Sequence, residues 1–95
     1  MLEELLLEIK NKRVLVIGDV MLDVYCHGVV GRMNPEEPAA PLLDLVRTEY
    51  CAGGAANVAM NAHELGARVT LLGVVGRDPA ADILREILQE KGILF

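Results

Sequence analysis

Residues 53–61, Gly-Gly-Ala-Ala-Asn-Val-Ala-Met-Asn, form the most informative stretch of this chain. Two glycines precede a run of small residues that is typical of a helix, and Asn57 falls in its first turn. The first turn of a helix has backbone N–H groups without partners inside the helix, so it can hold phosphate or hydroxyl oxygens. Asn57 can also donate to and accept from a pair of hydroxyls. The stretch predicts either a ligand-binding helix start or a plain turn from strand to helix, and spacing alone leaves both open.

A second polar cluster follows the apolar run 13–17, which predicts a buried strand. Asp19 and Asp23 come after this run, and open α/β sheets bind ligands beyond the carboxyl ends of their strands. Carboxylates accept hydrogen bonds from sugar hydroxyls, so the two clusters together indicate a sugar or nucleotide site. The alternative is that one of the two aspartates only forms a turn, and this alternative applies more to Asp19 than to Asp23. Neither cluster has the spacing of a dinucleotide-binding glycine motif or of a phosphate-binding P-loop.

The remaining apolar patterns predict alternating helices and strands. The helices are expected at residues 2–9, 54–65 and 79–91. The strands are expected at residues 13–17 and 68–72, with a further strand beginning at 93–95. The first helix is amphipathic and about three turns long. Gly66 and Gly92 suit helix ends, and Asp78 suits the cap of the last helix. This order predicts an α/β fold with a mainly parallel sheet and helices over its faces.

Residues 24–47 predict a β excursion from the main sheet. Val24 and Tyr25 favour a strand, and residues 42–46 predict a second one. Three of the four prolines lie between 33 and 41, at positions 35, 38 and 41, where they exclude a helix. Arg32 stands beside this proline loop and is a candidate for binding a sugar phosphate, with surface solvation as the default alternative.

Composition and charge narrow the function classes. Of the 95 residues, 53% are hydrophobic, and in so short a chain this excess predicts a partner, either more of the same chain or another subunit. The net charge of −5 and the absence of a basic cluster in the sequence argue against nucleic acid. The sequence has no membrane-length apolar run, and its acidic start argues against a signal peptide. Cys26 and Cys51 fit neither a disulfide scaffold nor a metal motif. We therefore expect a cytoplasmic protein.

Five segments together resemble the ribokinase-like (PfkB) carbohydrate kinases. The segments are Gly-Asp-Val-Met-Leu-Asp at 18–23, Arg-Met-Asn-Pro-Glu-Glu-Pro at 32–38, Gly-Gly-Ala-Ala-Asn-Val-Ala at 53–59, Leu-Gly-Ala at 65–67 and Val-Gly-Arg-Asp at 75–78. The resemblance runs from about residue 12 to the end of the chain. The first two segments favour the heptose 7-phosphate kinase branch, which serves ADP-heptose synthesis for bacterial lipopolysaccharide.

The resemblance implies a Rossmann-like parallel sheet sandwich with a small β lid at about residues 24–47. In this family the lid lies over the sugar and often forms a homodimer. The residues that the resemblance assigns to sugar hydroxyls are Asp23, Gly53, Gly54 and Asn57. It also implies that Arg32 lies on the lid near the substrate and that Asp19 lines the floor of the site.

The resemblance further implies that part of the enzyme is outside this chain. The catalytic base of the family is an aspartate in a Gly-Ala-Gly-Asp-like motif near the C-terminus, and the glycines before it form an anion hole. Residues 1–95 contain no such motif. The chain is therefore expected to be the N-terminal portion of a kinase domain, without catalytic or metal-binding residues. In the intact enzyme, ATP and Mg²⁺ would be held by residues outside this chain.

The intact enzyme is accordingly expected to transfer the γ-phosphoryl group of ATP to a sugar phosphate, with heptose 7-phosphate favoured. This chain alone is expected to be inactive, because it lacks the general base. Two alternatives stay open. One is a kinase of the same superfamily that acts on another sugar or on a nucleoside. The other is a non-catalytic association module, because strand edges and exposed apolar surface favour pairing with a partner chain.

Overall fold

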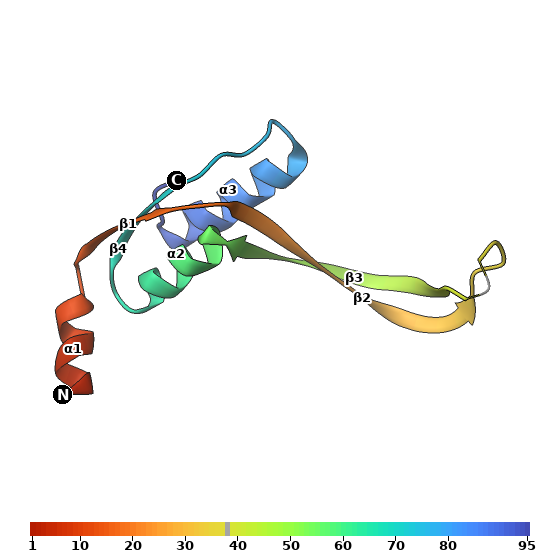
Figure 1. The fold of residues 1–95 in the computed structure, drawn as a ribbon, viewed down its shortest axis with the longest axis horizontal. Coiled ribbons are helices and arrows are strands. Elements are labelled where there is room, and N and C mark those ends of the chain that lie inside the picture. Colours follow the sequence, from red (N-terminus) through yellow and green to blue (C-terminus); the bar gives the residue numbers. More distant parts are fainter. Residues whose placement is uncertain (38) are drawn as a thin grey trace.

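A computed structural model describes residues 1–37 and 39–95 of the chain. Its helices are α1 (Leu2–Ile9), α2 (Ala55–Glu64) and α3 (Pro79–Lys91). Its strands are β1 (Arg13–Ile17), β2 (Val20–Met33), β3 (Pro41–Gly54) and β4 (Arg68–Leu72). Strands β1 and β4 and helices α2 and α3 form the body of the molecule (Figure 1). The β2–β3 ribbon projects from one side of this body, and α1 projects from the other.

Strands β1 and β4 pair in parallel, with Arg13 opposite Arg68 and Ile17 opposite Leu72. The chain after α3 returns to the other side of β4, where Leu94 forms a parallel bridge with Thr70. Leu71 N–H donates to the carbonyl oxygen of Leu94 at 2.7 Å, which fixes this register. The predicted parallel pairing is therefore confirmed, while the strand start expected at 93–95 is present only as a single bridge at Leu94.

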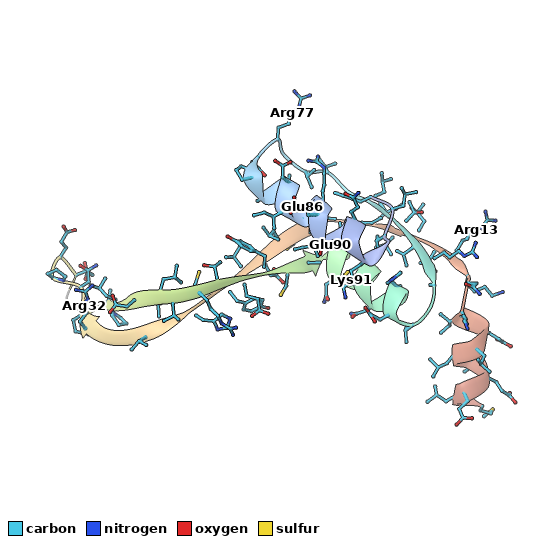
Figure 2. All side chains as sticks on the ribbon, turned by 180° about the vertical axis from the view of Figure 1, so that it is seen from behind. Arg13, Arg32, Arg77, Glu86, Glu90 and Lys91 are labelled. Carbon is cyan, nitrogen blue, oxygen red and sulfur yellow. The ribbon has the colours of Figure 1, made fainter. Side chains whose placement is uncertain are left out.

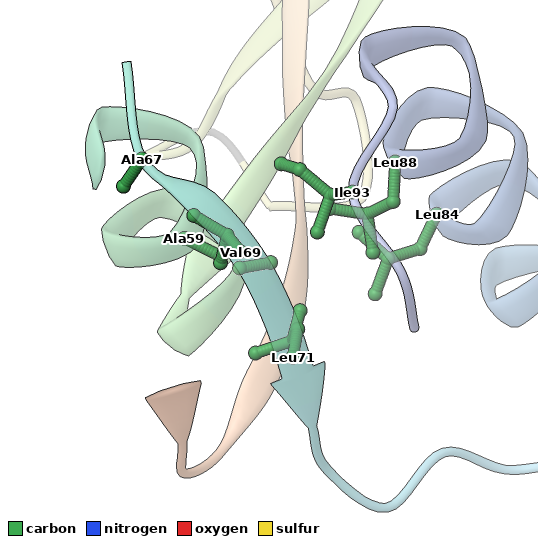
Figure 3. Close-up of a cluster of buried hydrophobic side chains, with 8 residues drawn as sticks. Ala59, Ala67, Val69, Leu71, Leu84, Leu88 and Ile93 are labelled. Carbon is green, nitrogen blue, oxygen red and sulfur yellow. The ribbon is translucent and has the colours of Figure 1, made fainter. Parts of the chain in front are cut away.

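One face of the parallel pair carries the core. Val69 and Leu71 of β4 point toward α2 and α3 and are almost completely buried. The other members of this core cluster are Ala56 and Ala59 of α2, Leu84 and Leu88 of α3, and two residues outside the helices, Ala67 and Ile93 (Figure 3). The alanines are small enough to let α2 approach the strand closely, while the leucines of α3 fill the remaining space. The alternation of buried and exposed residues along β4 follows from this one-sided cover.

The opposite face of the sheet is open. Leu15, Ile17 and Leu72 point away from the core and are 58%, 68% and 57% exposed. Helix α1 covers little of the sheet, because within the described residues only its last residue, Ile9, packs against the core cluster. The expectation of helices over the faces of the sheet therefore holds here for one face only. Helix α1 also has eight residues, which is about two turns and not the expected three.

The predicted helix ends agree with the structure. Gly66 and Gly92 have positive φ angles of 98° and 82°, in the region that favours glycine after a helix. Asp78 caps α3, because its Oδ1 accepts a hydrogen bond from the backbone N–H of Ala81 at 2.8 Å. Pro79 follows as the first residue of the helix, where its missing N–H has no cost.

The predicted β excursion is an antiparallel ribbon of two strands, each with 14 residues. Strand β3 continues well beyond the expected residues 42–46, through Gly54, so Gly53 and Gly54 end a strand and Ala55 begins α2. The ladder shifts register between His27 and Gly28 and between Val30 and Arg32. The glycines that interrupt the strand pattern thus lie at bulges within a continuous strand. Pro38, in the proline loop, lies outside the described residues.

Candidate functional site

The junction between β3 and α2 requires glycine at position 54. Gly54 has φ 57° and ψ −132°, a conformation that residues with a side chain rarely adopt. A Cβ atom at this position would also collide with the backbone oxygen of Asp19. That same oxygen accepts a hydrogen bond from the N–H of Ala55 at 2.8 Å. The loop after β1 is therefore joined directly to the start of α2.

Asp23 and Gly53 lie in contact across the ribbon. The carboxylate of Asp23 is so close to Gly53 that an added Cβ would be 2.5 Å from Oδ1 and 2.7 Å from Oδ2. Asp23 pairs with Cys51 in the ladder, so its side chain reaches diagonally to Gly53, which is buried. The glycine therefore makes the space in which the carboxylate lies. These two residues, selected from separate sequence segments, are brought together by the fold.

Asn57 and Asp19 complete the group around this junction. Asn57 is the third residue of α2 and is exposed, so it does lie in the first helical turn. Asp19 follows β1 and lines a hollow of about 410 Å³ beyond the ends of β1 and β4, together with Ile17 and Gly73. No side-chain hydrogen bond within residues 1–37 and 39–95 engages Asp19, Asp23 or Asn57. Their polar atoms can therefore bind a ligand.

Arg32 lies far from this junction. It stands near the far end of β2, nine residues beyond Asp23, which corresponds to about 30 Å along an extended strand. Figure 2 shows Arg32 at the distal end of the ribbon. There its guanidinium pairs with Asp44 at 3.0 Å, with both side chains largely exposed. The structure therefore does not bring Arg32 together with Asp23, Gly53 and Asn57.

The ribbon has one polar and one apolar face, which follow from its alternation and register. The polar face carries Asp23 and continues with charged pairs, such as His27 with Glu49 at 3.1 Å. The exposed members of the apolar face are Val24, Val30, Leu43, Leu45 and Tyr50. At its base this face runs into the body, where Val20, Leu22 and Ala52 pack against the core. The apolar face is thus an outward extension of the core.

Sequence reasoning missed His27, Glu49 and Asp44 as members of the face that carries Asp23. Residues 43–50 alternate only partly, because a bulge at Val46 changes the phase of β3. These three residues could have been found by assuming that two strands of equal length pair on either side of the proline loop. Once that pairing is assumed, Asp23, Tyr25 and His27 fall on one face by the two-residue period.

The described chain offers little for a resident metal. Residues 1–37 and 39–95 contain no group of three or more His, Cys, Asp or Glu side chains arranged to hold a metal ion. Cys26 and Cys51 are free thiols. None of the helices α1–α3 is long and apolar enough to cross a membrane.

Comparison with known proteins identifies related sequences. The family model for pfkB family carbohydrate kinases matches residues 11–94. The bifunctional protein HldE of Nitrosococcus oceani is 51% identical over 83 residues, which cover 87% of this chain and 17% of the relative. The same protein of Alcanivorax borkumensis is 57% identical over 76 residues, covering 80% and 16%. The D-beta-D-heptose 7-phosphate kinase of Bordetella bronchiseptica is 49% identical over 85 residues, covering 90% and 27%. The chain thus spans about a sixth to a quarter of the length of these relatives.

Proposed function

This chain belongs to the pfkB family of carbohydrate kinases, and from that membership we propose that it forms the sugar-binding N-terminal part of an ATP-dependent kinase that phosphorylates a sugar phosphate. The proposal rests on the junction between β3 and α2, where the Asp23 carboxylate lies against Gly53 beside the first turn of α2. The Asp23 carboxylate accepts no side-chain hydrogen bond within the described residues, and Asn57 stands in the first turn of the helix that begins beside it. Such a group suits several neighbouring hydroxyls.

The chemical role of these residues is to hold and orient the acceptor sugar. Asp23 accepts hydrogen bonds from sugar hydroxyls, and Asn57 both donates and accepts. Gly53 makes the space in which the Asp23 carboxylate lies, and Gly54 lets the chain turn from β3 into the start of α2. Asp19 lines the floor of the site on the side of the parallel strands. Fixing the acceptor in one orientation is a large part of phosphoryl-transfer catalysis, because that chemistry depends on positioning.

The proposal assigns ATP, Mg²⁺ and the general base to residues outside this chain. The described residues offer no metal-binding group, so no step is assigned to a metal here. When bound in the intact enzyme, Mg²⁺ neutralises charge on the phosphates of ATP. The 95-residue chain is expected to show no phosphotransfer above background. Turnover by this chain alone in a coupled ADP-release assay would contradict that assignment.

Heptose 7-phosphate is the substrate that we favour, because a relative that is 49% identical over 85 residues is named D-beta-D-heptose 7-phosphate kinase. The proposed role is cytoplasmic synthesis of ADP-heptose for the lipopolysaccharide core. The competing possibility is a kinase for another sugar or for a nucleoside. Calorimetric titrations with heptose 7-phosphate, fructose 6-phosphate, ribose and adenosine separate the two. We expect the tightest binding for heptose 7-phosphate, and tighter binding of any other compound would replace it as the substrate.

The ribbon at residues 24–47 is proposed as the lid of this kinase, with Arg32 as a phosphate-binding residue. Arg32 is about 30 Å along the strand from Asp23. To meet a sugar phosphate at the junction, it requires a bend in the ribbon or delivery from a second copy of the chain. Its partner Asp44 is exposed, so the ion pair holds Arg32 only weakly. Arg32 is therefore free to exchange Asp44 for a phosphate group.

We also propose that the apolar face of the ribbon pairs with the same face of a second copy. An isolated two-stranded ribbon is marginally stable in water, and this one leaves Val24, Val30 and Leu45 half or more exposed. Two copies related by a two-fold axis can bury these side chains against each other, because the axis brings the apolar faces of the two ribbons into contact. The same observation favours the association module as a second candidate function. A defined dimer by analytical ultracentrifugation, without affinity for any sugar phosphate, would support that candidate over the kinase.

A further inference from the structure

Met21 is an exposed apolar side chain within the polar junction. It lies in β2 between Asp19 and Asp23, directly opposite Gly53 in the ladder. Its neighbours Val20 and Leu22 point to the other face and pack against the core. Met21 instead shares the face of Asp23 and is 52% exposed. Its side chain therefore does not serve the core of the described molecule.

The thioether of Met21 lies beside Gly54, where α2 begins. Its Cγ and Cε atoms are 3.3 and 3.4 Å from the position that a Cβ on Gly54 would take. The side chain thus forms an apolar wall next to the glycine pair. The carboxylate of Asp23, two residues further along the same face of β2, lies against Gly53. A ligand on this face of the junction would meet an apolar group and a carboxylate next to each other.

We infer that Met21 is a sugar-contacting residue that packs against the C–H groups of the bound sugar. This inference rests on the function proposed above. A sugar ring presents apolar C–H faces as well as hydroxyl edges. Small-molecule sites combine apolar walls with a few polar groups that fix orientation. The flexible, polarizable methionine side chain adapts to such a surface. Packing on Met21 turns the hydroxyl edge of the sugar toward Asp23 and Asn57.

The methionine methyl groups give a direct test. The chain has four methionines, so carbon-13 labelling of their ε-methyl groups gives a simple NMR spectrum. On titration with heptose 7-phosphate, we expect the Met21 methyl signal to shift together with the side-chain amide signal of Asn57. The Met1 methyl is the control, because Met1 is exposed and precedes α1, which projects from the body on the side away from the ribbon (Figure 1). It should stay unchanged.

The same titration separates this inference from the proposed function. If the Asn57 signal shifts and the Met21 methyl does not, the sugar binds at the junction without touching Met21, and the inference is wrong. If neither signal shifts, the proposed function fails and the inference fails with it. Inorganic phosphate is the second probe, and it should leave the Met21 methyl in place because it has no C–H surface.

Affinity measurements give a second readout. Met21→Leu keeps an apolar side chain of similar size and should bind heptose 7-phosphate within about twofold of the unchanged chain. Met21→Ala removes the apolar wall and should weaken binding about tenfold. Leu7→Ala, at an exposed apolar position of α1, should change nothing. Equal affinity of Met21→Ala and the unchanged chain would overturn the inference.

Discussion

The carboxylate of Asp23 occupies the space that a side chain at Gly53 would take. All three of its carboxyl atoms lie 2.5–2.7 Å from the position of a Gly53 Cβ. This relationship joins the segment after β1 to the end of β3. It also explains why a residue without a side chain stands at position 53, since any Cβ there displaces the carboxylate.

Gly53→Ala is expected to weaken sugar binding more than it weakens folding. The carboxylate is the end of an exposed side chain, so it can rotate away from the new methyl group at small cost in stability. The displaced carboxylate no longer meets the sugar, and affinity for heptose 7-phosphate should fall about tenfold. Calorimetry measures the affinity, and urea unfolding measures the stability.

A double-mutant cycle isolates the coupling between these two residues. In an Asp23→Ala background, Gly53→Ala should have no further effect on affinity, because the carboxylate it displaces is already gone. Full additivity of the two losses would show that Gly53 acts independently of Asp23.

Gly54→Ala is expected to destabilise the fold itself. The substitution places a Cβ against the backbone oxygen of Asp19 at a residue with φ 57°, and neither atom can move without shifting the chain. We expect a loss of about 2–4 kcal/mol in the free energy of unfolding. Gly31→Ala is the control, because a Cβ there meets nothing within 4 Å. Its effect should stay near 0.5 kcal/mol or less, as is typical of open surface positions. Similar losses at both glycines would contradict the account of the junction.

Val30→Lys is expected to dissociate the proposed dimer, because it places a charge on the apolar face of the ribbon. Val29→Lys is a matched control, since the two valines are 59% and 61% exposed but lie on opposite faces. Sedimentation velocity should give a monomer for Val30→Lys and a dimer for Val29→Lys and for the unchanged chain. Loss of the dimer in both variants, or in neither, would exclude the apolar face as the interface.

Asp78→Ala is expected to lower the free energy of unfolding by about 1 kcal/mol, because the N–H of Ala81 loses its capping oxygen. Asp78→Ser restores an acceptor and should recover most of that loss. Thermal unfolding of the three proteins measures both effects. An Asp78→Ala variant as stable as the unchanged chain would show that the cap contributes nothing.

Much of the body could be predicted from the sequence, because its signals are local. Residues 13–17 and 68–72 are short, mostly apolar runs rich in Val, Leu and Ile, a composition that favours strands of a parallel sheet. Gly66 and Gly92 end their helices through their own backbone preference. These features depend on a few neighbouring residues and need no knowledge of distant contacts.

The ribbon and the position of Arg32 could not be predicted in the same way. The faces of β2 and β3 depend on the register between two strands, and bulges at Val46 and Gly31 shift it. The extension of β3 to Gly54 depends on pairing with Val20, more than thirty residues earlier. The sequence placed Arg32 beside a loop, but only the length of the ribbon shows how far that loop lies from Asp23.

The central claim is that the junction of Asp23, Gly53 and Asn57 binds the sugar part of a sugar phosphate. Isothermal titration of heptose 7-phosphate into this chain and into its Asp23→Ala variant tests it most directly. The account predicts saturable binding to one site per chain, weakened at least about tenfold by Asp23→Ala. Equal binding by the two proteins, or no saturable binding by the unchanged chain, would contradict it.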